Sequence, residues 1–253
     1  MSSRPESPRI LPAVGRFWRE RAQRSGFFIA TLDLTAACWG FLRDSTPSRL
    51  RSRFGDAGYD WDYRVNTTSG AVGWRDRLLG VFHSPYQPTE RELFHEMVGA
   101  LAEQTKLNFA DFTFIDLGSG KGRALLMASD YPFQGIVGME LLPALHEIAR
   151  QNVEQYKSDS QKCFRIKTIC GDATEFEFPD RPLLLYLFNP LPESGLRRTI
   201  TNLAQSLERK PRAAYVLYHN PLLENVVMED AKFQKIAGTH QFSVFASTSA
   251  SRN

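Results

Sequence analysis

Cysteine is scarce in this chain. Its 253 residues include only three cysteines, Cys38, Cys163 and Cys170, and their spacing does not fit a metal site. A small, odd number argues against a disulfide framework and for a reducing compartment, so we expect a cytoplasmic protein. The five histidines lack metal-ligand spacing as well, and the sequence therefore predicts no metal site.

Long apolar runs are also missing. The longest, residues 27–42, has sixteen residues and contains Asp33, which makes it too short and too polar to span a membrane comfortably. Arginines precede it, as in a signal peptide, but no clean cleavage site follows. We therefore expect a buried or partner-facing helix there.

Lysine is absent from residues 1–53, which contain ten arginines and four acidic residues. The rest of the chain contains 21 basic and 24 acidic residues, so the positive charge is concentrated in this N-terminal arm. A basic arm suggests an acidic partner or surface, although a solvated, partly ordered extension has the same composition. Aromatic residues are not interleaved as in RNA-binding segments, which disfavours nucleic acid as the partner without excluding it.

The first 85 residues show little regular pattern. Residues 1–25 are rich in serine, proline and arginine, so we expect loose order at the start. Residues 43–88 are loop-like, and their aromatic residues, as in YDWDYRV, are expected to pack on the main domain. We divide the chain into a mainly helical and loop-like N-terminal extension, 1–85, and a main domain, 86–253.

Regular alternation begins at residue 89. TERELFHEMVGALAEQ has Thr89 and Glu92 at capping-box spacing, followed by apolar residues at helical spacing, which predicts a helix capped by Thr89. After it, expected strands alternate with expected helices. The strands are 112–117, 135–140, 164–170, 183–189 and 213–219, followed by FQKIAG and FSVFAS. The helices are at about 121–130, 143–157 and 193–208. This order predicts an α/β fold with a doubly wound, mostly parallel seven-stranded sheet and a C-terminal antiparallel hairpin.

A glycine-rich turn follows the first expected strand, in FTFIDLGSGKGRALLMAS, residues 112–129. It is not a P-loop, because Lys121 is followed by Gly122 rather than by serine or threonine. It departs from the dinucleotide fingerprint, because Arg123 stands where the third glycine should be. What remains is Asp-x-Gly-x-Gly-x-Gly, in which Asp116 suits a ligand with a positive ammonium group and the glycines let the backbone approach it. A tight turn with an incidental aspartate is the alternative.

Two more acidic residues follow expected strands. Glu140 ends the second strand, where α/β nucleotide sites keep a carboxylate for ribose hydroxyls. In Gly171-Asp172-Ala173, after the third strand, the aspartate can accept from an adenine amino group while the next backbone N–H donates to the ring. An exposed strand-end acid and a Gly-Asp turn are the respective alternatives. With the aspartate of the glycine-rich turn, these acids occupy successive carboxyl ends of parallel strands, which predicts one shared ligand crevice.

Residues 86–253 resemble the class I, seven-strand S-adenosylmethionine-dependent methyltransferases. The features that carry the resemblance are the motif DLGSGKG (116–122), Glu140 and the Gly-Asp-Ala motif. In that family the seventh strand runs antiparallel, as in the expected hairpin. The resemblance implies S-adenosylmethionine as the cofactor, with Glu140 at its ribose hydroxyls and Asp172 with Ala173 at its adenine. The methionine moiety would be held by Asp116 and the loop residues Gly118, Ser119, Gly120 and Gly122.

Three further stretches resemble, more narrowly, a largely uncharacterised group of bacterial methyltransferases: YDWDYRVNTTSG, the lead-in YQPT (86–89) and YLFNP (186–190). By analogy, Tyr86 and Thr89 lie where the lead-in segment covers the donor pocket. A packed tyrosine and a helix cap are the alternatives.

Asn189-Pro190 ends the fourth strand, beside the expected position of the transferred methyl group. The proline is expected to hold Asn189 extended, with its side chain in the crevice. Relatives that methylate amino groups have Asn/Asp-Pro-Pro-aromatic here, and this chain lacks the second proline in register and the aromatic residue. A strand-ending turn is the alternative. Asn220, before Pro221, is expected to flank the same mouth, and His219 beside it is the histidine that we expect to accept a proton.

The sequence thus predicts a methyltransferase whose acceptor is unidentified, with a nitrogen of a protein side chain or of a small molecule as one candidate. An alternative from another class is a non-catalytic donor-fold module that docks on nucleic acid or on an acidic protein through the basic arm. A nicotinamide-dependent dehydrogenase is a third reading, which the misplaced third glycine disfavours.

Overall fold

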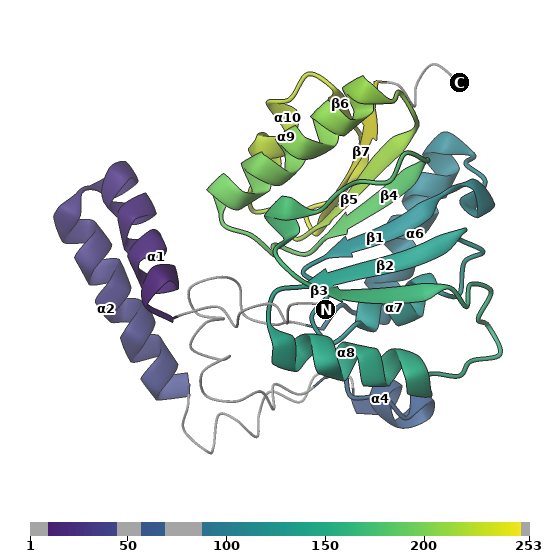
Figure 1. Ribbon diagram of the computed structural model, residues 1–253, viewed down its shortest axis with the longest axis horizontal. Coiled ribbons are helices and arrows are strands. Elements are labelled where there is room, and N and C mark those ends of the chain that lie inside the picture. The colour runs from purple at the N-terminus through teal and green to yellow at the C-terminus, as the bar shows by residue number, and fades with distance from the viewer. Residues whose placement is uncertain (1–9, 45–56, 69–87, 249–253) are drawn as a thin grey trace, which may run out of the picture.

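A seven-stranded sheet forms the centre of the computed structural model, which describes residues 10–44, 57–68 and 88–248 (Figure 1). The strand order is β3-β2-β1-β4-β5-β7-β6. The first five strands pair in parallel, and β7 runs antiparallel to both β5 and β6. The expected fold class is therefore confirmed. The strands are β1 (Thr113–Leu117), β2 (Gly135–Glu140), β3 (Ile166–Cys170), β4 (Leu183–Leu187), β5 (Ala214–His219), β6 (Phe233–Gly238) and β7 (Phe242–Ser247).

Helices cover both faces of the sheet. One face carries α6, α7 and α8, and the other carries α9 and α10 (Figure 1). Side chains of each inner strand alternate between the two cores: in β4, Leu184 and Tyr186 face the first core and Leu185 the second. Because both faces are buried, β1 and β4 are buried along their whole length. The helices are α6 (Arg91–Thr105), α7 (Arg123–Ala128), α8 (Pro143–Gln155), α9 (Glu193–Arg209) and α10 (Glu224–Met228).

Helices α1 (Ile10–Ser25) and α2 (Phe27–Asp44) form a hairpin beside the sheet (Figure 1). Residues 10–25 are thus helical, whereas the start of the chain, where we expected loose order, lies outside the described residues. The expected apolar helix is present as α2, but it is not buried, since Phe28, Leu32 and Trp39 are 83%, 67% and 69% exposed. No described helix is long and apolar enough to cross a membrane.

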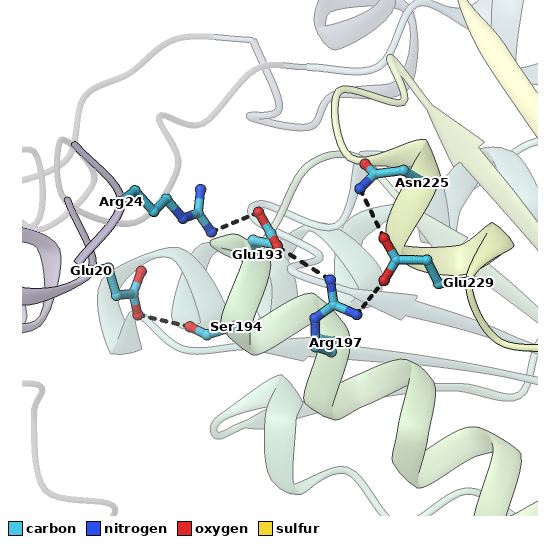
Figure 2. A network of polar contacts seen from close by, with 7 residues as sticks. All are labelled: Glu20, Arg24, Glu193, Ser194, Arg197, Asn225 and Glu229. Atoms are coloured by element: carbon cyan, nitrogen blue, oxygen red, sulfur yellow. Dashed lines mark hydrogen bonds and ion pairs between the residues drawn. The ribbon is translucent and has the colours of Figure 1, made fainter.

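Polar contacts connect this hairpin to the start of α9 (Figure 2). Arg24 Nη2 lies 2.6 Å from Glu193 Oε2, and Ser194 donates a hydrogen bond of 2.7 Å to Glu20. Glu193 is shared with Arg197 of the same helix, at 3.2 Å. Exposed ion pairs of this kind typically contribute about 0–1 kcal/mol each, so they show where the hairpin contacts the main domain without supplying much stability.

Residues 57–68 belong to the main core rather than to the hairpin. Helix α4 (Ala57–Tyr63) buries Tyr59 in the core formed with α6 and α7. Asp60 closes the turn that follows, because its carboxylate accepts hydrogen bonds from the backbone N–H and hydroxyl groups of Thr67 and Thr68. The expected domain boundary at residue 85 lies outside the described residues.

Candidate functional site

The glycine loop, residues 118–122, joins β1 to α7 at the carboxyl edge of the sheet. Its three glycines have φ values of 85°, 54° and 83°. The N–H groups of Gly118 and Ser119 donate to Met139 O at 2.8 and 3.0 Å, which ties the loop to the end of β2. An alanine Cβ at residue 118 would lie 2.3 Å from Cβ of Pro190. The close approach of the Asn-Pro turn therefore requires glycine here, and the loop and that turn are in contact.

Two buried carboxyl groups lie at this loop. Glu140 is 7% exposed, and its two oxygens accept hydrogen bonds of 2.8 Å from the N–H groups of Gly120 and Leu142. Asp116 is 3% exposed, and none of the described residues donates a hydrogen bond to its carboxyl. Burial raises the pKa of Asp116 well above its usual value, and the nearby charge of Glu140 raises this pKa further.

The pKa of Glu140 is also raised, because its burial outweighs the opposing effect of its backbone N–H donors. Both carboxylates are thus costly to keep ionised without a cation. Since an opposite charge nearby favours the ionised form, a positively charged ligand at this edge would lower both pKa values.

The third expected acid, Asp172, lies at the next strand end. Its Oδ1 accepts a hydrogen bond of 2.8 Å from Thr174 N, and so caps the short 3-10 helix Ala173–Glu175. One carboxylate oxygen thus closes the Gly-Asp turn. The adjacent Gly171 N donates to Glu140 O at 2.9 Å. Because β1, β2 and β3 are neighbours in the sheet, the three acids share one edge, as the sequence indicated.

Asn189 does not have the extended conformation that we expected from the following proline. Its φ is 44°, in the left-handed region, which asparagine tolerates better than most residues. Two hydrogen bonds hold its amide there: Tyr218 OH donates to Oδ1 at 2.9 Å, and Nδ2 donates to Asn220 O at 2.5 Å. The Asn189 amide therefore joins the ends of β4 and β5, and tertiary contacts outweigh the local preference.

A cleft of about 770 Å³ opens beside Asn220. It lies between the start of α6, the ends of β4 and β5, and the turn between β6 and β7. His219 stacks on Phe188 with ring centroids 3.8 Å apart. No group of three or more His, Cys, Asp or Glu residues that could hold a metal ion occurs in the described part of the chain. The lining residues are Pro88, Thr89, Glu90, Glu92, Leu93, Arg123, Phe188, His219, Asn220, His240 and Gln241.

Thr89 does not cap α6, so the predicted capping box is wrong. The N-cap residue is Glu90, which makes no side-chain capping bond. The Thr89 hydroxyl instead lies 2.8 Å from Tyr186 OH, and that phenol oxygen lies 2.9 Å from His219 Nδ1. The tertiary partner thus replaces the local one. Tyr86, the other residue expected over the donor pocket, lies outside the described residues.

Two basic residues, Lys121 in the loop and Arg123 at the start of α7, bind residues 57–68. Lys121 Nζ donates to Asn66 Oδ1 at 2.9 Å, and Arg123 Nη1 donates to Thr67 Oγ1 at 3.1 Å. The Arg123 guanidinium also lies 4.2 Å from the centre of the Tyr59 ring. Both cations are buried. In the sequence these two residues only exclude other glycine motifs, whereas in the structure their contacts join the segment 57–68 to the loop.

Three residues that shape the site were missed by sequence reasoning. Tyr186 reads as one residue of an apolar strand. Gly138 lies within β2, and an alanine Cβ there would lie 2.5 Å from Leu125 Cδ1, so glycine allows α7 to pack closely. Asn152, in α8, donates to the Lys121 carbonyl at 2.9 Å. An asparagine on the apolar face of an amphipathic helix is the one sequence signal that predicts such a contact.

Comparisons with known proteins found no matching family model and no matching curated protein. Solved structures do match in part. YcgJ from Bacillus subtilis matches over 53% of this chain and 55% of its own, at 19% identity and TM-score 0.38. An RNA methyltransferase from Salinibacter ruber, in complex with S-adenosyl-L-homocysteine, matches over 63% and 91%, at 19% identity and TM-score 0.41.

A precorrin-6y C5,15-methyltransferase from Geobacter metallireducens matches over 65% of this chain and 92% of its own, at 13% identity and TM-score 0.48. At TM-scores below 0.5, these likenesses assign no ligand and no reaction to this chain. Its own strand order is the stronger finding, because seven strands close with an antiparallel β7. The fold is the one that the sequence resemblance implies.

Proposed function

We propose that this protein is an S-adenosylmethionine-dependent methyltransferase. The observation that carries the proposal is Asp116, a buried carboxyl at the glycine loop with no hydrogen-bond donor among the described residues. Ser119 Oγ, in the same loop, is also buried and without a partner in the described part of the chain. Buried polar groups without partners are rare in proteins, and a ligand is one way to satisfy them. The methionine end of S-adenosylmethionine is cationic, and its charge complements the carboxyl groups at this edge of the sheet.

The donor-binding residues follow from the strand ends. Asp116 and the loop residues Gly118, Ser119, Gly120 and Gly122 would hold the methionine moiety. Glu140 would accept hydrogen bonds from the ribose hydroxyls with the lone pairs that its two N–H donors leave. The remaining Asp172 oxygen and the Ala173 N–H would contact adenine. Bound there, the sulfonium supplies an activated methyl group.

The protein's own contribution is mainly alignment. Holding an acceptor in line with the methyl carbon supplies a proximity effect of up to roughly 7–11 kcal/mol, so a strong base is not required for every acceptor. The cleft beside Phe188 and His219 is the proposed acceptor site. Asn189 flanks it with Pro190 and Asn220, and one lone pair of its Oδ1 is left by Tyr218 to accept from an acceptor N–H. A nitrogen acceptor is therefore consistent with the site.

Calorimetry on the full chain tests the proposal. S-adenosylmethionine or its demethylated product should bind, and nicotinamide dinucleotides should not. Asp116→Asn is the informative variant, because it removes a charge that is costly when buried and keeps the side-chain shape. We expect it to unfold at a higher temperature than the wild type at pH 7 and to bind the donor about ten- to a hundredfold more weakly.

The sign of the stability change follows from linkage. A folded pKa above the unfolded value means that the ionised carboxyl opposes folding at every pH above the unfolded pKa. Loss of both stability and affinity in Asp116→Asn would indicate a damaged fold. Heat from nicotinamide dinucleotides, with none from the methyl donor, would exclude the proposed function.

A further inference from the structure

A hydrogen-bonded chain of three side chains runs along the cleft from Thr89, just before α6, to His219 at the end of β5. Thr89 Oγ1 lies 2.8 Å from Tyr186 OH, which lies 2.9 Å from His219 Nδ1. The three residues are 5%, 1% and 6% exposed. The chain therefore lies in a low-dielectric environment, where hydrogen bonds are strong and an unpaired donor is costly. Both of its ends, Thr89 and His219, line the cleft.

The chemistry of the three groups sets the direction of their protons. An imidazole nitrogen, whose conjugate acid has a pKa of about 6.5, is a better acceptor than a phenol oxygen. A phenol, with a pKa of about 10, is in turn a better donor than a neutral imidazole N–H. Tyr186 therefore donates to His219 Nδ1. Thr89 lies at the other end of the chain, and Tyr186 OH is the only described acceptor of its buried hydroxyl hydrogen.

This direction fixes the state of His219. A neutral imidazole has one N–H and one bare nitrogen, so a bare Nδ1 that accepts from Tyr186 leaves the hydrogen on Nε2. Burial lowers the pKa of His219 to about 4, which keeps the ring neutral at pH 7. The charged and titratable residues that share the cleft with it are Glu90, Glu92, Arg123 and His240.

We propose that Thr89 and Tyr186 are positioning residues that hold His219 as the Nε2–H tautomer, so that it donates a hydrogen bond to the methyl acceptor instead of removing its proton. This rests on the proposed function and replaces the proton-accepting role expected from the sequence. The methyl acceptor then has a neutral hydrogen-bond-accepting atom, such as a carbonyl or hydroxyl oxygen, facing His219. The two carboxylates of the cleft disfavour an anionic group there.

Nuclear magnetic resonance of the histidine rings tests the tautomer without donor or acceptor. Long-range nitrogen–proton spectra of ¹⁵N-labelled full chain between pH 5.5 and 8 distinguish the two neutral tautomers from imidazolium. His219→Gln identifies the His219 signals by their loss. We expect one tautomer, with hydrogen on Nε2, across this range. In Tyr186→Phe we expect both tautomers to be populated.

Tyr131→Phe is the matched control. Tyr131 OH lies 2.7 Å from His95 Nδ1, so this variant also breaks a tyrosine–histidine pair, but outside the cleft. It should change the signals of His95 and leave those of His219 as in the wild type. A wild-type His219 with hydrogen on Nδ1, or charged above pH 6, would overturn the proposal. An unchanged tautomer in Tyr186→Phe would overturn the positioning role.

Calorimetry with the methyl donor separates this inference from the proposed function. Tyr186→Phe should keep the wild-type donor affinity, because its contacts lie on the acceptor side. A protein that binds no methyl donor but shows the Nε2–H tautomer would lose the proposed function and keep the His219 assignment.

Discussion

Replacement of Glu140 by glutamine separates two roles that the structure gives to one carboxylate. Its oxygens accept hydrogen bonds of 2.8 Å from the N–H groups of Gly120 and Leu142, and the proposed donor would add its ribose hydroxyls. Glutamine keeps one acceptor oxygen but turns an NH₂ group toward the other N–H. One buried backbone donor is then unpaired, at a cost of about 1–3 kcal/mol, and removal of a charge that burial makes costly acts in the opposite direction. The midpoint of thermal unfolding should fall by about 2–4 °C for each kcal/mol by which the unpaired donor outweighs the lost charge.

Donor affinity should fall as well. Hydrogen bonds to a charged group contribute about 1.5–3 kcal/mol, which corresponds to roughly a ten- to hundredfold loss in calorimetry. Glu177→Gln, at an exposed carboxylate beyond β3, is the matched control and should change neither quantity. A lower unfolding temperature with wild-type affinity would refute the ribose role and leave Glu140 as an anchor of the loop. If neither quantity changed, the loop contacts themselves would be wrong.

Three further predictions concern the loop, its neighbouring turn and the hairpin. Gly118→Ala should lower the unfolding temperature, because the new Cβ would lie 2.3 Å from Cβ of Pro190 at a backbone φ of 85°. The control Gly99→Ala, in open space on α6, should not lower it, and equal effects of the two variants would contradict the packing argument. Asn189→Gly removes the side-chain amide, and glycine tolerates the left-handed backbone. Labelled methyl transfer to acceptors in cell extract should therefore fall, while the donor affinity measured by calorimetry stays at the wild-type value. Normal transfer would mean that Asn189 only ends the strand in a turn. Deletion of residues 1–44 should leave donor affinity unchanged, and its loss would place the hairpin at the donor site.

The structure of the segment 57–68 was the hardest to predict from the sequence. It gives no periodic signal, and its structure depends on partners far along the sequence: Asn66 binds Lys121, and Thr67 binds Arg123. For a related reason, the sequence left open whether the apolar side of α2 is buried or faces a partner. Composition predicted a helix there, but composition does not determine which neighbour covers it.

Local chemistry was enough to determine the order of strands and helices and the three acids at the ends of β1, β2 and β3. Periodicity and turn residues act over a few positions, and carboxyl ends of parallel strands meet at one edge whatever the details of packing. Tertiary structure alone decided the hydrogen-bond partners. Thr89 had a local role as a cap and took a distant one beside Tyr186, and Asn189 took a left-handed backbone because Tyr218 and Asn220 hold its amide. Those contacts join residues up to 97 positions apart, and their energies exceed the local preferences on which a sequence pattern depends.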